Sequence, residues 1–458
     1  MRPSILLIMI GLALCALAQP QTPAAGVVHP SVAVSGDPSN SYALYLPSNY
    51  SAQKHWPLLL VFDPFGRGET GVKLFHEAAE KYGLIVVGSN NSRNFQDPSE
   101  AIRLLWADVK ERYAINPRRI YTAGLSGGAR VAASIALACK SCVAGVIANG
   151  AGLPQGASTP GPEIADWFLV AGTTDFNYPE LLKLKESLDA NNVASRFVVY
   201  DGPHNWMPAD FAEHAVAWLQ LRAMTKGLTT PDQAFINGQF SSRLAEAKNA
   251  QSTGNVLAAV RAWDEIVQDF RTVRDVKELE ALGKKLAGSE EFRKAKKNEK
   301  AMLDLQDDVA RKIGNLAAGI NQEPDNRTAY FSQLQTAVND AEREQKSAKA
   351  ERKNAIERGM ASAFAYAAET GQQAMLKKDF LAAKEMFQAG EIIEAKSAWA
   401  SYLLATAYAQ LGEKKQAIAE LKKALDKGMT NTKALEDAAF DKIREEREFK
   451  EIEGRMKK

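Results

Sequence analysis

The chain has 458 residues and a formal net charge of +2, a length that corresponds to two or three domains of ordinary size. The first 230 residues contain 36 charged side chains and the other 228 contain 76, while 16 of the 18 prolines and all five histidines lie in the first part. Both parts are nearly neutral, which argues against a nucleic-acid-binding protein because no basic excess is available to neutralise phosphates. The contrast predicts two parts of different fold class.

Residues 1–18 have the pattern of a secretory signal. A basic residue precedes an apolar run over residues 5–17, and a small-x-small triplet predicts cleavage before Gln19. The run is short for a membrane span. A lipoprotein signal anchored at Cys15 is the less favoured alternative, because Leu14 stands where a small residue is wanted. We therefore expect an exported protein, periplasmic or secreted, with no transmembrane segment in the mature chain.

Removal of the signal would leave two cysteines, Cys139 and Cys142. In an oxidising compartment an even pair at this spacing predicts a local disulfide. A redox-active C-x-x-C is the alternative, but the setting of such motifs, at the start of a helix that follows a strand, is missing here. We expect a structural bridge.

After a linker over residues 19–30, residues 31–225 alternate short apolar runs with amphipathic stretches. This alternation is typical of a mostly parallel sheet flanked by helices, which is the α/β class. The predicted strands are residues 41–46, 56–62, 84–88, 119–123, 143–148, 167–171 and 196–200. The predicted helices are residues 72–82, 98–113, 127–139, 179–190 and 209–224.

The sequence Gly-Leu-Ser-Gly-Gly at residues 124–128 fits the pattern G-x-S-x-G. The string alone is weak, because ordinary usage of glycine and serine produces it in roughly one chain of this length in six. Its position after a predicted strand and before a predicted helix makes it specific. The glycines permit a tight, strained turn that presents the hydroxyl of Ser126 in the open. The alternative interpretation of Ser126 is a helix cap.

A nucleophilic serine requires a base, and the base requires an orienting acid. His204 follows the last predicted strand and Asp175 follows the strand before it, so both are expected at the sheet edge where Ser126 emerges. Their order along the chain, Ser then Asp then His, is that expected of such a catalytic triad. A loop histidine and a capping aspartate are the alternatives, and Asp201 is a reserve candidate for the acid.

An oxyanion intermediate also needs backbone donors. Gly127, directly after the serine, is one. The loop after the second predicted strand should supply the other from Phe65 or Gly66, because Pro64 has no N–H. Possible substrate-binding side chains near this edge are Arg67, Arg130 and Trp206. Arg130 is equally a candidate for a buried structural ion pair.

With these features, residues 31–225 resemble a minimal α/β-hydrolase of the polyhydroxybutyrate-depolymerase/feruloyl-esterase-like and dienelactone-hydrolase-like kind. The resemblance is carried by residues 42–47, Tyr-Ala-Leu-Tyr-Leu-Pro; by residues 124–128 with the following Ala-Arg; and by residues 202–206, Gly-Pro-His-Asn-Trp. It implies that Ser126 is the nucleophile, His204 the base and Asp175 the acid. It also implies acyl transfer to water through an acyl-enzyme, with no metal or other cofactor.

The chain departs from this pattern in two places. The loop begins Asp63-Pro64 where many relatives carry His-Gly, and Pro203 replaces a frequent glycine. The first departure bears on the oxyanion geometry. Only 48 residues separate Ser126 from Asp175, which leaves no room for a large inserted lid. We therefore expect an open site that tolerates bulky acyl or alcohol groups.

Beyond residue 225 the strand signals stop, and the rest of the chain is predicted to be all-α. Residues 226–363 should form long charged helices, with one apolar stripe recurring at spacings of three or four over residues 302–320. Residues 341–358 interleave acidic with basic side chains, which favours a solvated helix over a nucleic-acid site.

Residues 364–458 are predicted to contain repeats and a C-terminal cap. Residues 364–397 align with 398–431 at a shift of 34, the period of the tetratricopeptide repeat. The second copy resembles that motif at Tyr408, Gly412, Ala417 and Ala424. The resemblance implies a concave surface for a protein or peptide partner. A stalk or a dimerisation element is the alternative.

Taken together, the motifs predict an exported serine hydrolase that cleaves carboxylic esters, with a helical repeat domain that binds a partner or positions the catalytic unit. One alternative is a non-catalytic binding protein that retains the hydrolase fold. A further alternative is a serine peptidase, because ester and amide hydrolysis use the same machinery.

Overall fold

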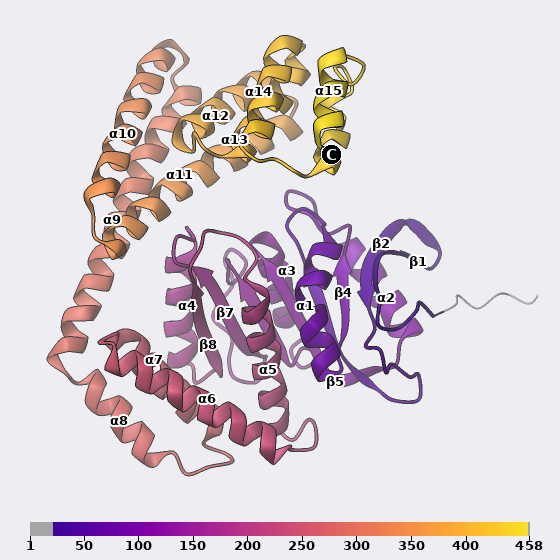
Figure 1. Ribbon diagram of the computed structural model, residues 1–458, viewed down its shortest axis with the longest axis vertical. Coiled ribbons are helices and arrows are strands. Elements are labelled where there is room, and N and C mark those ends of the chain that lie inside the picture. The colour runs from indigo at the N-terminus through magenta and orange to yellow at the C-terminus, as the bar shows by residue number, and fades with distance from the viewer. Residues whose placement is uncertain (1–21, 457–458) are drawn as a thin grey trace, which may run out of the picture.

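The computed structural model describes residues 22–456, so the predicted signal over residues 1–18 and Cys15 lie outside the described residues. Figure 1 shows an α/β part with a group of helices below and to one side of it and a second group above it. One long helix, α9 (Glu290–Gln322), connects the two groups. No helix within residues 22–456 combines the length and apolar character needed to cross a membrane.

The sheet has eight strands in the order β1-β2-β4-β3-β5-β6-β7-β8. β1 and β2 are antiparallel to their neighbours, and all other neighbouring strands are parallel. The strands are β1 (Val28–Val34), β2 (Asp37–Tyr45), β3 (Trp56–Phe62), β4 (Ile85–Ser89), β5 (Ile115–Leu125), β6 (Gly145–Asn149), β7 (Asp166–Gly172) and β8 (Ser195–Tyr200). This order, with helices on both faces, is the α/β-hydrolase fold.

Five helices cover the two faces of the sheet. They are α1 (Gly68–Tyr82), α2 (Ser99–Arg112), α3 (Gly127–Ala138), α4 (Tyr178–Ala190) and α5 (Ala209–Thr225). Alternate residues of the strands pack with α2, α3 and α4 in one core cluster and with α1 and α5 in another. All seven residues of β3 are buried because the strand is covered on both sides.

The seven predicted strands and five predicted helices of this part are all present; β3 has the predicted bounds, and the others have at least one shifted end. β1, however, was not predicted, and it begins inside the predicted linker over residues 19–30. The prediction failed there because β1 lies at the edge of the sheet and only Val34 in it is buried, so the strand lacks a clear apolar pattern.

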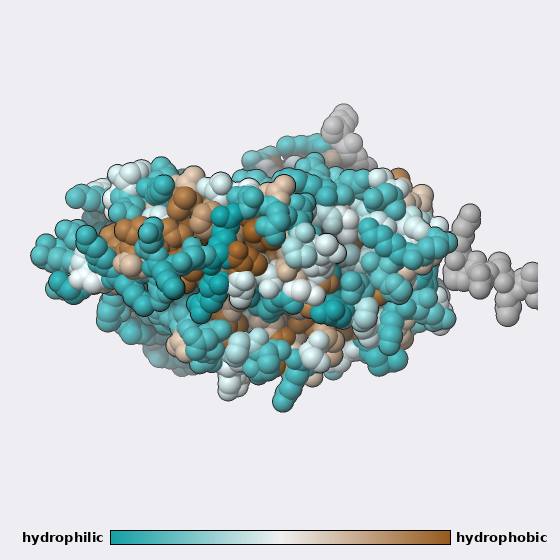
Figure 2. Space-filling view, turned by 90° about the horizontal axis from the view of Figure 1, so that it is seen from below, coloured by the Kyte–Doolittle hydropathy of each residue, from teal (hydrophilic) through white to brown (hydrophobic). Residues whose placement is uncertain are grey.

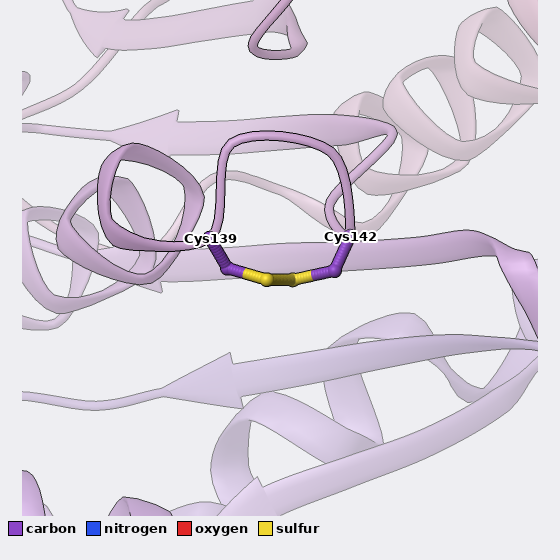
Figure 3. The surroundings of a disulfide bond; sticks show 2 residues. All are labelled: Cys139 and Cys142. Atoms are coloured by element: carbon purple, nitrogen blue, oxygen red, sulfur yellow. A yellow bond between two sulfur atoms is a disulfide. The ribbon is translucent and has the colours of Figure 1, made fainter.

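The predicted disulfide between Cys139 and Cys142 is present (Figure 3). It closes the turn that follows α3, on the connection to β6. This turn lies at the end of α3 away from Ser126, so the disulfide is not next to that serine.

The helical region, residues 233–456, begins after α5. Its helices are α6 (Gln233–Ser252), α7 (Val256–Phe270), α8 (Lys277–Ala287), α9, α10 (Arg327–Ser347), α11 (Ala350–Leu376), α12 (Phe380–Ile393), α13 (Ala398–Leu411), α14 (Lys414–Asp426) and α15 (Arg447–Met456). α12 and α14 begin 34 residues apart, which equals the predicted shift. Gly371 of α11 lies so close to Phe387 of α12 that an added Cβ would be 2.4 Å from its ring. Assignment of these hairpins to the tetratricopeptide repeats stays a prediction.

Of the helices below the sheet, α7 packs directly against it and covers its open edge at β8. Gln268 accepts a hydrogen bond from the Ser195 amide (2.9 Å) and donates one to the Val193 carbonyl (3.1 Å). Glu265 accepts one from the Phe197 amide (3.1 Å). Side chains of α7 therefore satisfy backbone groups that an exposed edge strand would offer to another chain.

A buried group of charges lies where α7 meets α5. Asp269 is 2% exposed and accepts a hydrogen bond from the Trp218 indole (2.9 Å). Burial raises the pKa of Asp269 to about 6, and the positive charges of Arg196 and Arg222 oppose the rise. The ordinary value is 3.8, so the folded protein holds this proton more tightly than the unfolded chain.

The expected consequence is a pH-dependent stability. The contribution of Asp269 is fully present below pH 3.8 and is lost as the pH rises through about 6, which corresponds to about 3 kcal/mol in the free energy of unfolding. Asp269→Asn keeps an acceptor for Trp218 and should remove this dependence. Urea unfolding of both proteins between pH 4 and 7 measures it, with Asp308→Asn on an exposed face of α9 as the control. A constant difference between wild type and Asp269→Asn across that range would contradict the prediction.

Candidate active site

Ser126 occupies the sharp turn between β5 and α3. Its φ is +54° and its ψ is −121°, a strained conformation for a residue with a side chain. A Cβ at Gly124 would lie 2.2 Å from the carbonyl carbon of Gly128, and a Cβ at Gly128 would lie 2.0 Å from the oxygen of Phe62. Both positions therefore require glycine, and the turn leaves Ser126 half-buried at the carboxyl edge of the sheet.

His204 and Asp175 form a hydrogen-bonded pair. His204 Nδ1 lies 2.8 Å from Asp175 Oδ1, and the carboxylate is fully buried. The same oxygen accepts a hydrogen bond from the Asn177 amide (2.8 Å). With Nδ1–H donated to the carboxylate, Nε2 is the ring nitrogen that retains a lone pair. The pair therefore has the polarity that a general base and its orienting acid require.

The imidazole is held on two sides. The ring of Phe176 lies 4.2 Å from that of His204, centroid to centroid. On another side, a Cβ at Gly150 would lie 2.9 Å from His204 Cε1 and 3.0 Å from Asp175 Oδ2. Gly150 also has a φ of +65°, so glycine is required there by both space and backbone conformation.

Tyr200 braces the loop that carries His204. Its hydroxyl lies 2.7 Å from the Pro203 carbonyl and 2.8 Å from the Asn205 carbonyl. Burial, together with the negative charge of Asp175, raises the pKa of Tyr200 to about 12. The hydroxyl therefore keeps its proton and remains a donor at neutral pH.

Asn149, at the end of β6, links the serine turn to the histidine loop. Its carbonyl accepts from the Ser126 amide (2.9 Å). Its side chain donates to the Asn205 carbonyl (3.1 Å) and accepts from the Met207 amide (2.7 Å). Asn149 was not predicted as a site residue, although its position directly after an apolar strand run is a usable signal. Through it, the elements carrying Ser126 and His204 meet at one rim.

The predicted oxyanion donors differ in their surroundings. Gly127 is the first residue of α3, and a Cβ there would lie 1.9 Å from Asn94 Oδ1. The amide of Phe65 donates to Asp63 Oδ1 (2.9 Å) and the amide of Gly66 donates to the Asp63 carbonyl (3.0 Å). In this conformation neither loop amide is free, because Asp63 folds the loop back on itself.

Asp63 also engages two of the side chains predicted to bind substrate. Arg67 donates two hydrogen bonds of 2.9 Å to its carboxylate, and the Trp206 indole donates a third of 2.9 Å. Asp63 is 1% exposed. Arg67 and Trp206 thus satisfy a buried carboxylate and position this loop, and their role in substrate binding stays a prediction.

Arg130 forms an ion pair, as its alternative interpretation proposed, but the pair is not buried: 36% of the Arg130 side chain and 34% of the Glu180 side chain are exposed. Its guanidinium makes two hydrogen bonds of 2.8 Å to Glu180 and one of 2.6 Å to the Leu153 carbonyl. Glu180 in turn accepts from the Gly152 amide (2.8 Å). The pair also lines an open hollow of about 270 Å³, with Lys183 on the same wall. Arg130 therefore lies at the border of the site with its charge already paired.

The expectation of an open site needs correction, because helices from the C-terminal part lie over this rim. Figure 1 shows α11 and the helices after it above the sheet. The ring of Trp399 in α13 contacts that of Phe65 at 5.5 Å. Glu369 of α11 lies within electrostatic range of Arg130 and His204: partial burial raises the pKa of Glu369, and its interactions with these two residues oppose the rise. The cover comes from the end of the chain, so the short segment between Ser126 and Asp175 gave no sign of it.

Several solved structures resemble this chain. The substrate-bound fluorophosphonate-binding serine hydrolase F of Staphylococcus aureus is 16% identical with a TM-score of 0.33, and the match covers 42% of this chain and 96% of that one. The S-formylglutathione hydrolase of Staphylococcus aureus is 14% identical with a TM-score of 0.34, and the match covers 44% of this chain and 99% of that one. The feruloyl esterase module of Clostridium thermocellum is 16% identical with a TM-score of 0.33, and the match covers 42% of this chain and 84% of that one. No protein-family model and no curated protein sequence matches the chain. The fold assignment rests on the strand order and the serine turn.

Proposed function

We propose that the protein is a serine hydrolase that cleaves carboxylic esters through an acyl-enzyme. The observation that carries the proposal is the 2.8 Å hydrogen bond between His204 and a buried Asp175, at the same rim as a serine with a φ of +54°. Each part alone has a structural explanation. Their combination on the carboxyl edge of an α/β-hydrolase sheet is the arrangement that activates a hydroxyl.

In the proposed reaction, His204 Nε2 takes the hydroxyl proton of Ser126 as Oγ attacks the ester carbonyl carbon. Asp175 stabilises the imidazolium that forms. The tetrahedral intermediate collapses, the C–O bond to the alcohol breaks, and the imidazolium returns its proton to the departing alkoxide. Water then attacks the acyl-enzyme by the same route, which releases the acid and regenerates Ser126.

The oxyanion requires donors at the serine turn. The amide of Gly127, at the start of α3, is the first, and the helix dipole adds to it. Because Asp63 engages the two loop amides, we propose the side-chain amide of Asn94 as the second donor; its Oδ1 and Nδ2 would lie 1.9 and 3.1 Å from a Cβ at Gly127. Asn94→Ala is expected to lower kcat about 10²- to 10³-fold with little change in KM. An unchanged kcat would return the role to the loop that contains Phe65.

The test of the proposed function is rapid-mixing kinetics with p-nitrophenyl esters. An acyl-enzyme predicts a burst of p-nitrophenol approaching one equivalent per chain when deacylation is the slower step, followed by steady turnover. Panels of esters and peptides, assayed side by side, separate an esterase from a peptidase. A folded protein that turns over neither panel would support the binding-protein alternative, in which the helical region performs the biological role.

The helical region is proposed to bind a protein or peptide partner or to position the catalytic unit. The 34-residue offset of its hairpins supports the first role. The contact between Trp399 and Phe65 supports the second. Export of the protein is consistent with the disulfide between Cys139 and Cys142.

A further inference from the structure

Two side chains of the helical region reach the loop that carries the catalytic acid, residues 173–177. Arg358 of α11 donates to the Thr173 carbonyl (2.8 Å). Gln306 of α9 donates to the Phe176 carbonyl (2.9 Å). These carbonyls stand on either side of Asp175, so the helical region holds the loop at both ends of the acid.

Arg358 and Gln306 also bind each other. Arg358 Nε donates to Gln306 Oε1 (2.6 Å), which uses the side-chain oxygen that the contact with Phe176 leaves free. The helices cross closely at this point: a Cβ at Gly359 would lie 2.8 Å from the Gln306 carbonyl oxygen. The glycine next to Arg358 therefore lets α11 approach α9 closely enough for the two side chains to act as one unit.

The burial of Arg358 is energetically unfavourable in itself. The residue is 6% exposed, and within residues 22–456 no carboxylate forms an ion pair with it. Its guanidinium instead lies 4.8 Å from the Tyr178 ring. Burial lowers the pKa of Arg358, and the negative charge of Asp175 opposes the change. Burying an apolar residue between these helices would cost less free energy than burying a guanidinium. The hydrogen bond to the Thr173 carbonyl is therefore the interaction that gives Arg358 a role here.

From these contacts we infer that Arg358 is a positioning residue of the active site, which acts with Gln306 on the loop of Asp175. The inference rests on the proposed serine-hydrolase function. Asp175 holds the His204 ring, and Phe176, whose carbonyl Gln306 binds, packs against that ring. A shift of this loop moves the imidazole relative to Ser126, and misplacement by about 1 Å costs up to about 10²-fold in rate. The active site is therefore completed by α9 and α11, which begin more than 100 residues after Asp175.

The test compares Arg358→Ala and Gln306→Met with wild type and with Arg352→Ala. Arg352 is the matched control, because it lies on the same helix but pairs with Glu344 inside the helical region. The readouts are kcat and KM for an ester, and the rate constant and final amplitude of labelling by a fluorophosphonate. Gln306→Met serves where Arg358→Ala fails to fold, since it keeps the arginine and nearly the same volume.

Loss of positioning is expected to lower kcat and the labelling rate constant about 10- to 100-fold with KM within about twofold of wild type. Arg352→Ala should behave as wild type, and the double variant Arg358→Ala/Gln306→Met should be no slower than the worse single variant. A lower labelling amplitude with an unchanged rate constant would overturn the inference, because it indicates only a smaller folded fraction. A higher KM with unchanged kcat would also overturn it. Absence of labelling in the wild type would instead refute the proposed function.

Discussion

Replacement of Ser126 by alanine is expected to lower kcat for ester hydrolysis by about five to six orders of magnitude. The residual rate is the one that the oxyanion donors and substrate binding support without a nucleophile. The reason is that the hydroxyl is the attacking group, and no other side chain can form the acyl-enzyme. The burst of p-nitrophenol should disappear together with the steady turnover. Binding of substrate should persist, because the variant keeps the rim intact.

Ser134→Ala is the matched control for this variant. Ser134 lies on the same helix, α3, and its hydroxyl donates to the Arg130 carbonyl (2.8 Å), away from the reacting atoms. It should retain wild-type kcat. Residual hydrolysis by Ser126→Ala above about 1% of wild type would contradict the assignment of the nucleophile.

Asp175→Asn is expected to lower kcat about 10⁴-fold while the protein stays folded. An amide at this position donates to the histidine instead of accepting, so the ring presents the wrong tautomer to the serine. Because Asp175 Oδ1 accepts from both His204 and the Asn177 amide, the variant also loses the Asn177 hydrogen bond when its amide nitrogen faces the ring. Steady-state kinetics from pH 6 to 9 measure the loss, and thermal unfolding checks the fold.

Asp201→Asn distinguishes the two candidate acids. Asp201 lies three residues before His204 and accepts a hydrogen bond from the Thr173 hydroxyl (3.0 Å), whereas the His204 ring bonds to Asp175. It should keep most of the activity. A loss from Asp201→Asn as large as that from Asp175→Asn would exchange the two roles.

The strands, the helices beside them and the serine turn could be predicted from the sequence because their signals are local. Residues 56–62 are apolar throughout since both faces of β3 are covered, and Gly124 and Gly128 have no room for a side chain. Asp175 and His204 each follow a strand, so the sheet alone was enough to expect them at one edge.

What the sequence did not reveal depends on the geometry of one loop and on contacts between distant segments. The engagement of the Phe65 and Gly66 amides follows from how Asp63 turns its own loop, and no spacing rule encodes that geometry. Arg358 and Gln306 belong to charged helices in which most such side chains are solvated. Only the folded chain places them beside Thr173 and Phe176. Likewise, only the folded chain brings Trp399 of α13 against Phe65 at the rim of the site.

The protein is proposed to carry one activated serine. This is tested by reacting the protein with a fluorophosphonate, digesting it and locating the adduct by mass spectrometry. A single adduct on Ser126 is expected in the wild type and none in His204→Ala, because the hydroxyl is unreactive without its base. An adduct on another residue, or equal labelling of Ser126 with and without His204, would contradict the proposal.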